Sequence, residues 1–406
     1  MKLKLFLIAA SAMALASCSS DEVVKNNEDA NAIQFSVVAN NASRAADYYC
    51  NSVKPADFVV SASVGGKMYF DQEIFKTADN GASYQIFGDL RYWPAAEITF
   101  VAAKNCDGDA FTFNAETGST FTMTVPEAAS EQKDFIFGVT KATRDGQNYS
   151  GGKAKINFRH ALSQIVFQAK NTNENIFVEI EQIKVCNLAN SATYTIPATA
   201  GNYVVTDDAY IDHTQTSTTD PVDATVYQEG GRGTWSAWSA ATSNFDTGKF
   251  TVAKVPGTGT LVNLTNDRFG GTGDHVANAS HTHSLLLIPQ AVTKWTNGGA
   301  VASADGAYFL ISCKIRNVAK GDGLEDAGDV YLWGSAGAYD EIAVPVEAIT
   351  WVQGKKYIYT LNFTDNGHGG FDPDNGDEVL IPIEFTVSVD DFAEDTTTPG
   401  QEIAID

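Results

Sequence analysis

The stretch Ile33-Gln34-Phe35-Ser36-Val37 alternates apolar and polar residues, and this pattern decides the fold class. A period of two places Ile33, Phe35 and Val37 on one face of a strand and the polar residues on the other. Similar runs recur along the chain between turn residues such as Gly65-Gly66 and Asp107-Gly108. No convincing amphipathic helix interrupts them. The sequence therefore predicts an all-β protein made of β-sandwiches.

Two series of predicted strands divide the chain into two domains in tandem. The polar, glycine-bearing stretch 144–152 separates the series, so the sequence predicts an N-terminal β-sandwich over residues 45–150 and a C-terminal one over residues 151–406. Residues 198–280 form a long insertion in the second domain, rich in Thr, Asp, Gly and Ser. A loop of this length is typically functional or disordered.

The amino-terminal eighteen residues read as a lipoprotein signal peptide. A basic start, Met1–Lys4, precedes the apolar run Leu5–Leu15 and the small residues before Cys18. Leu15–Cys18 resembles the bacterial lipobox, which implies diacylation of Cys18 and anchoring in the outer membrane. The short stretch Ser19-Ser20-Asp21-Glu22 that follows ends in two acidic residues and is interpreted either as a surface-export signal or as the start of a solvated tether.

Charge and cysteine content exclude several functions. The formal net charge is −23, which disfavours nucleic acids and anionic membrane surfaces as partners. The four cysteines after the signal peptide contain no C-x-x-C pair, so a zinc or thioredoxin-type site is not expected. An exported protein can form disulfides, and the pairing of these cysteines stays open. They are Cys50, Cys106, Cys186 and Cys313.

Motifs for catalysis, metal binding or cofactors are weak. The chain lacks the nucleophile-elbow, zinc-protease, phosphate-loop and dinucleotide signatures, so neither an enzyme nor a bound cofactor is predicted. His281 and His283, with His275 nearby, admit a metal site, but two polar histidines at a loop edge are the favoured interpretation. His160 is predicted to be a structural histidine. The carboxylate-rich stretch 365–378 is predicted to form a solvated turn rather than a calcium loop.

Some of the aromatic residues inside the long insertion have two possible roles, and both interpretations stay open. Exposed rings in a polar loop can stack on sugars or contact a host protein. They can equally anchor the insertion on its own sandwich, which is the favoured interpretation. The residues are Tyr210, Tyr227, Trp235 and Trp238.

Several segments together resemble the fimbrillin family, the lipoprotein-derived subunits of type V pili. The order and spacing of these segments over residues 15–392 carry the resemblance, because each one alone is a short strand with an aromatic residue. The segments are Tyr92-Trp93-Pro94, Gln132–Phe137, Ile156–Ile165, Leu286–Gln290, Trp351–Leu361 and Ile383–Phe392.

The resemblance implies two transthyretin-like β-sandwich domains and a structural role in a surface fimbria, with adhesion. In polymerising members of the family an arginine-specific protease cuts after the first strand, and Arg44-Ala45 is the matching position here. Residues 19–44 are then a propeptide that contains an acidic tether and a first strand. The other interpretation of Arg44 is an ordinary loop arginine.

A cut after Arg44 would remove the strand that carries Ile33, Phe35 and Val37 and leave an apolar groove with unpaired backbone groups. Ile383-Glu384-Phe385-Thr386-Val387 repeats the same pattern, and Val389 extends it, so this segment is a predicted donor strand for a neighbouring subunit.

The expected partners are other fimbrial subunits, the outer membrane through the lipid anchor, and a ligand on a host or bacterial surface. The alternative function is a monomeric surface-tethered lipoprotein that binds a glycan or host protein, or a tip or anchor subunit.

Overall fold

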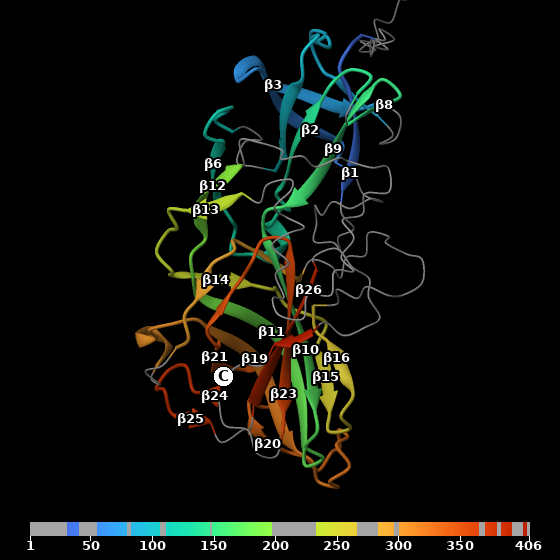
Figure 1. The fold of residues 1–406 in the computed structure, drawn as a ribbon. Helices are drawn as coiled ribbons and strands as arrows, with labels where there is room; N and C mark the ends of the chain where they lie inside the picture. Colours follow the sequence, from blue (N-terminus) through green and yellow to red (C-terminus); the bar gives the residue numbers. More distant parts are fainter. Residues whose placement is uncertain are drawn as a thin grey trace, which may run out of the picture.

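Strands build almost all of the molecule. The computed structural model describes residues 31–39, 55–78, 83–105, 111–146, 148–196, 233–265, 283–295, 300–364, 370–379, 383–391 and 401–403. Helical elements in these ranges are short 3-10 turns such as η2 (Ala129–Glu131) and η4 (Val301–Ser303). None of the helices within them is long and apolar enough to cross a membrane. The chain is elongated, with one sandwich toward each end (Figure 1).

One sheet wraps around the core of the first sandwich, and its first strand closes it. The strand order is β1-β4-β3-β2-β5-β7-β9-β8, and β1 also pairs with β9, so seven of the strands form a ring. Turns such as Gly65-Gly66, both at positive φ, connect neighbouring strands. The strands are β1 (Gln34–Ala39), β2 (Asp57–Val64), β3 (Lys67–Thr77), β4 (Tyr84–Ile86), β5 (Ile98–Lys104), β7 (Ile136–Ala142), β8 (Tyr149–Ser150) and β9 (Lys153–His160).

Strands β2 and β5 are buried on both faces because each serves two cores. In β2, Phe58 and Val60 face the inside of the ring, whereas Val59 faces a second core toward the other sandwich. Phe100 and Val101 divide in the same way in β5. This arrangement explains why each strand contains a run of consecutive apolar residues, Phe58-Val59-Val60 and Phe100-Val101-Ala102.

The second sandwich has two sheets. The first has the order β16-β10-β23-β26-β27, with β17 beside β10. It comprises β10 (Ser163–Asn171), β16 (Leu261–Asn263), β17 (Leu285–Leu287), β23 (Lys355–Phe363), β26 (Ile383–Asp391) and β27 (Gln401–Ile403).

The second sheet of this sandwich has the order β14-β11-β19-β21-β24-β25, with β15 beside β11 and β20 beside β19. It comprises β11 (Ile176–Leu188), β14 (Ser243–Asp246), β15 (Ala253–Pro256), β19 (Tyr308–Asn317), β20 (Val330–Trp333), β21 (Asp340–Pro345), β24 (Gly370–Phe371) and β25 (Glu378–Val379). A small ladder joins β18 (Ala291–Val292) to β22 (Ile349–Thr350).

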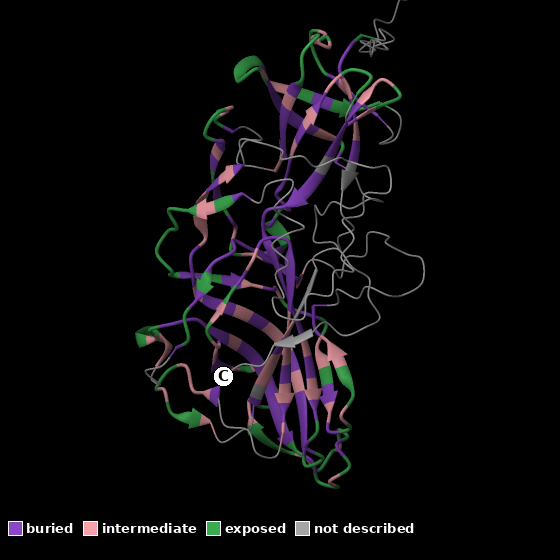
Figure 2. Ribbon diagram, viewed as in Figure 1, coloured by how far each residue is buried: buried purple, intermediate pink, exposed green. Residues whose placement is uncertain are grey.

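A three-stranded sheet joins the two sandwiches, and we call it the bridging sheet. It consists of β6 (Ser119–Thr124), which precedes the transition between β9 and β10, with β12 (Ser191–Ile196) and β13 (Thr234–Ser236), which follow it. β6 and β12 pair over six residues. One hydrophobic core runs under this sheet and includes side chains of both halves, such as Phe121, Phe137, Tyr194 and Trp351. Buried residues accordingly continue from one sandwich into the other in Figure 2.

The predicted fold class, all-β with β-sandwiches in tandem, is confirmed. The transition between the two sandwiches falls between β9 and β10, and the exact domain limits stay a prediction. Residues 233–265 of the predicted insertion contain the short strands β13 to β16, which pair with β10, β11 and β12. This part of the insertion is therefore built into the sheets.

Candidate functional site

The candidate site is the position of β1 inside the first sandwich. Ile33, Phe35 and Val37 lie on one face of the segment and are 1%, 0% and 2% exposed. Phe35 sits at the centre, with its ring centroid 4.7 Å from that of Phe75 and 4.9 Å from that of Phe100, both edge-on. Edge-to-face contacts of this kind add to the stabilisation that burial alone provides.

The backbone of β1 is paired on both sides. On one side it runs parallel to β9 over six residue pairs, from Gln34–Lys153 to Ala39–Phe158. On the other side it pairs antiparallel with β4 at Gln34 and Phe35. The Ile33 amide adds a 2.8 Å hydrogen bond to the carbonyl of Arg91. β1 is therefore a central strand of the ring rather than an edge strand.

Loss of β1 would change the chemistry of this region in two ways. The edges of β4 and β9 would each carry a row of amide and carbonyl groups without partners, which is unfavourable unless another strand or water satisfies them. The rings of Phe58, Phe75 and Phe100, which now contact Phe35, would line an apolar slot. We call this region the β1 slot. It can accept an extended segment with apolar residues at alternate positions.

The predicted donor segment is β26, which lies between β23 and β27 in the second sandwich. Ile383 and Val387 are buried, and Phe385 packs half-buried with its ring centroid 5.4 Å from that of Phe309. These three side chains share one face, as in β1. β26 pairs antiparallel with β23 over nine residues, in which Val389 lies opposite Tyr357.

The last described strand, β27, is attached less extensively. Among the described strands it pairs with β26 alone, over three residues from Val387–Ile403 to Val389–Gln401. The terminal sequence Ile403-Ala404-Ile405 also alternates, so its two isoleucines would share one face of a strand.

The predicted lipidation and cleavage residues, Cys18, Arg44 and Ala45, lie outside the described residues. Arg44 is nevertheless close to β1 in the sequence, because it follows the last residue of that strand by five positions. These three residues stay predictions.

The histidines that the structure describes have structural partners. His160 is buried, and its Nδ1 lies 2.9 Å from a carboxylate oxygen of the buried Asp134. His283 Nδ1 lies 2.7 Å from the carbonyl oxygen of Thr247. His275 and His281 lie outside the described residues. Within the part of the chain that the structure covers, no group of three potential ligands is arranged to hold a metal ion.

The acidic stretch near the carboxyl end forms a turn where the structure describes it. It connects β24 to β25, and Asp372 and Asn375 accept hydrogen bonds from the amides of Asp374 and Asp377. Such bonds of a side chain to the amide two residues later are typical of tight turns. Residues 365–369 lie outside the described ranges.

The two described tryptophans of the insertion behave differently. Trp235 anchors the insertion: its indole donates a 3.0 Å hydrogen bond to the carbonyl of Ala161, and its ring packs 4.7 Å from Tyr194. Trp238 is exposed. Tyr210 and Tyr227 lie outside the described residues.

The two described cysteines are free and buried. Cys186 and Cys313 lie on the neighbouring strands β11 and β19, but each faces a different residue across the ladder, Tyr308 and Ile180. Burial raises the pKa of the Cys186 thiol to about 12 and also raises the pKa of Cys313. Both thiols are therefore protonated at neutral pH and inert as nucleophiles.

Comparison with solved structures finds distant likenesses. A fimbrial protein from Bacteroides vulgatus ATCC 8482 has 13% sequence identity and a TM-score of 0.45, over 87% of this chain and 98% of that one. A "putative cell adhesion protein" from Bacteroides ovatus ATCC 8483 has 11% identity and a TM-score of 0.43, over 89% and 97% of the two chains. No curated protein matches the chain.

The family comparison covers most of the sequence. The model of the fimbrillin-like family matches residues 24–388, a range that contains the first sandwich with β1 and all of the second except the end of β26 and β27. It agrees with the resemblance carried by the short motifs. The chain belongs to the fimbrillin-like family.

Proposed function

We propose that this protein is a subunit of a type V fimbria that assembles by donor-strand exchange after proteolysis behind Arg44. The family supports a structural or adhesive role in fimbriae, a location at the cell surface and association with other fimbrial subunits. The proposal adds the lipid anchor at Cys18, the cut between Arg44 and Ala45, and the exchange itself. Nothing in the fibre role requires catalysis.

The observation that carries the proposal is the position of β1. β1 is an amino-terminal segment that completes the core of the first sandwich. Because the proposed cut after Arg44 follows β1, the segment can leave while the rest of the chain stays continuous. Its removal would expose three buried apolar side-chain positions, each contributing roughly 1.5–3 kcal/mol when filled. It would also free the edges of β4 and β9. An open slot of this kind favours a strand supplied by a neighbouring subunit.

In this proposal the donor comes from the carboxyl-terminal segment, whose two strands, β26 and β27, differ in the number of pairs that their release would break. Release of β26 breaks nine pairs with β23 and takes Ile383 and Val387 out of their own core. That step would fill the β1 slot of a neighbouring subunit but open a similar gap in the second sandwich of the donor. Release of β27 breaks three pairs at a sheet edge. We therefore favour the terminal residues from Gln401 onward as the donor over the Ile383–Val389 segment predicted from the pattern.

The test is to treat the soluble chain that starts at Ser19 with an arginine-specific protease and to measure the size of the product by light scattering. The expected result is conversion of monomer into polymer together with loss of residues up to Arg44. An Arg44→Ala chain is the matched control and should stay monomeric. A wild-type chain that is cut cleanly after Arg44 and remains monomeric would contradict the proposal.

A second measurement addresses delivery of the protein. The amino terminus of protein recovered from the cell surface should be Ala45 if the subunit is released from its anchor. A lipidated Cys18 on all recovered protein would instead favour the tethered alternative, a surface lipoprotein or an anchor subunit.

A further inference from the structure

The outer face of the bridging sheet carries only threonine and serine. Strands β6, β12 and β13, side by side in Figure 1, direct apolar side chains such as Phe121, Tyr194 and Trp235 toward the core. The alternate residues of each strand therefore lie on the opposite face, where they are exposed or half-buried. Thr112, which forms a bridge to Thr120, extends this set. We call it the hydroxyl face: Thr112, Thr120, Thr122, Thr124, Ser191, Thr193, Thr195, Thr234 and Ser236.

The hydroxyl face is one continuous array, because its residues lie directly opposite one another on neighbouring strands. The hydroxyl oxygens of Thr122 and Thr193 are 3.2 Å apart. The Thr124 hydroxyl donates a 3.2 Å hydrogen bond to that of Ser191. With about 4.8 Å between strands and about 6.8 Å between alternate residues of a strand, the array covers about 14 Å in each direction. Its rows are Thr112-Thr120-Thr195-Thr234, Thr122-Thr193-Ser236 and Thr124-Ser191.

The hydroxyl face lacks charge although the chain is strongly charged. Charged residues make up 19% of the chain. Threonine is common in strands because its branched side chain suits a pleated surface. That preference does not explain the missing charges, since exposed edge strands such as β13 usually carry charged side chains that prevent unwanted pairing. No Asp, Glu, Lys or Arg occurs in the four segments that contain the face and its surroundings, residues 111–115, 117–126, 185–196 and 233–245.

An exposed tryptophan lies at one end of the hydroxyl face. Trp238 is 46% exposed and stands in the sequence between Ser236, which belongs to the face, and Ser239. The Ser239 amide donates a 2.8 Å hydrogen bond to the carbonyl of Ser191. The Ser239 hydroxyl accepts hydrogen bonds of 3.2 Å from the amides of Asn190 and Ser191. These bonds fasten the segment that carries Trp238 to β12, at the Ser191 end of the face.

We propose that the hydroxyl face and Trp238 together bind an uncharged glycan. A sugar presents many hydroxyl groups that donate and accept hydrogen bonds, and each threonine or serine hydroxyl can do both. These side chains are short, so ordering them on binding costs little conformational entropy. An exposed indole adds a flat, rigid apolar surface for the C–H side of a sugar ring. The inference rests on the proposed function for the adhesive role and names the class of ligand for that role.

Other occupants of the hydroxyl face match it less well. Protein partners usually bind through buried tryptophan, tyrosine and arginine side chains, and serine and threonine are under-represented among the residues that dominate such contacts. Two copies of this chain would each bring a net charge of −23 and would bury little apolar area between two hydroxyl faces. Acidic polysaccharides meet the same net charge. An uncharged glycan is the ligand that matches both the missing charge and the dense hydroxyl groups.

The test is affinity electrophoresis of the soluble, uncleaved chain from Ser19 in native gels that each contain one polysaccharide. The uncharged probes are dextran, galactomannan and xyloglucan, and the anionic probe is polygalacturonate. At least one uncharged polysaccharide should retard the protein, and polygalacturonate should not. Absence of retardation by all three uncharged polysaccharides would overturn the proposal, and so would retardation by polygalacturonate alone.

Variants of the exposed side chains locate the binding surface. Trp238→Ala removes the ring, and a double variant with Thr122→Val and Thr193→Val removes two central hydroxyl groups while keeping their shape. Each should weaken binding about tenfold. Trp238→Phe keeps a ring and should lose less than threefold. Thr350→Val, at an exposed strand position outside the face, is the matched control and should bind like the wild type. Wild-type binding by both Trp238→Ala and the double variant would overturn the proposal.

The same chains separate this proposal from a contact between copies and from strand exchange. Self-association of the uncleaved wild-type chain in sedimentation velocity, abolished in the double valine variant, would show that a second copy covers the face and would overturn the glycan proposal. After protease treatment the double variant should polymerise like the wild type, because the hydroxyl face lies outside the β1 slot. A wild-type chain that binds an uncharged polysaccharide but fails to polymerise after the cut would reject strand exchange alone.

Discussion

β1 and β26 have nearly the same side-chain pattern but different surroundings. Each places Ile, Phe and Val on one face toward a core, and each Phe contacts other aromatic rings. β1, however, is paired along a parallel neighbour and completes a ring, whereas β26 lies antiparallel to β23 and has β27 on its outer side. The alternation determines which side chains are buried. It does not determine which strand lies beside them or how easily the segment can leave.

The largest expected effect is on stability, from truncation of the aromatic residue in each segment. Phe35→Ala should lower the free energy of unfolding of the first sandwich by about 3–5 kcal/mol, because the ring is fully buried among other aromatic rings. Phe385→Ala should cost about half as much, since Phe385 is half-buried. Urea unfolding followed by circular dichroism measures both. Equal losses in the free energy of unfolding would show that Phe35 and Phe385 do not differ in burial as described.

The next effect concerns the donor. A chain that ends at Phe392 lacks β27, and its fold should be retained with a small loss of stability, because β27 pairs over three residues at an edge. This chain should fail to polymerise after the cut behind Arg44. Light scattering of the cleaved product checks it. Polymerisation at the wild-type rate would instead assign the donor role to β26.

A smaller effect is expected on thiol reactivity. Cys186 and Cys313 are buried in the second sandwich and protonated, so they should not react with an aromatic disulfide reagent in the native state. They should become reactive only in denaturant. To isolate them, Cys50 and Cys106 are replaced by serine. Reaction without denaturant would mean that the second sandwich opens more readily than the long ladder between β11 and β19 indicates.

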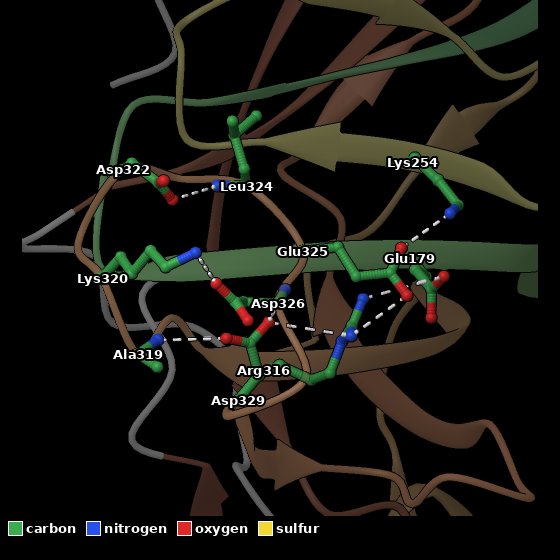
Figure 3. Close-up of polar contacts among 10 residues, drawn as sticks. All are labelled: Glu179, Lys254, Arg316, Ala319, Lys320, Asp322, Leu324, Glu325, Asp326 and Asp329. Carbon is green, nitrogen blue, oxygen red and sulfur yellow. Dashed lines mark hydrogen bonds and ion pairs between the residues drawn. The ribbon is translucent and has the colours of Figure 1, made fainter.

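The smallest effect is expected at low pH on residues 318–329 between β19 and β20, which we call the tail loop (Figure 3). The Lys254 ammonium holds the pKa of Glu325 below its usual range, the Lys320 ammonium does so for Asp326, and the amides of Asp326 and Ala319 do so for Asp329. A lowered pKa in the folded state stabilises the loop at pH values above the unfolded pKa. That contribution is lost as the pH falls through the folded pKa, below about 4. The protection factors of the Asp326 and Leu324 amides against hydrogen exchange should therefore fall in acid, while those in β1 should not.

The fold class and the buried faces could be predicted from the sequence because period-2 alternation depends on local geometry. Ile33, Phe35 and Val37 illustrate this, and so does Trp235, which anchors the insertion as favoured. The parallel partner of β1 could not be predicted, because a pairing between residues 34–39 and 153–158 leaves no local mark. The short strands β13 to β16 were missed since three or four residues are too few to show a period.

The charged tail loop was missed for a different reason. Residues 318–329 contain two glycines at positive φ and several aspartates, a composition that indicates only a turn. The contacts that make it rigid come from Arg316 and from Lys254, which lies far away in sequence. Such contacts follow from the tertiary fold.

The bridging sheet gives the molecule a mechanical property. A subunit in a fibre is pulled at its two ends, and the tension must cross from one sandwich to the other. The six-residue ladder between β6 and β12, with the continuous core beneath it, has to rupture before the halves separate. The protein should therefore resist tension as one stiff unit rather than as two sandwiches joined by a flexible linker. In single-molecule stretching, we expect one unfolding event at high force. Two domains joined by a hinge would instead lengthen first at low force.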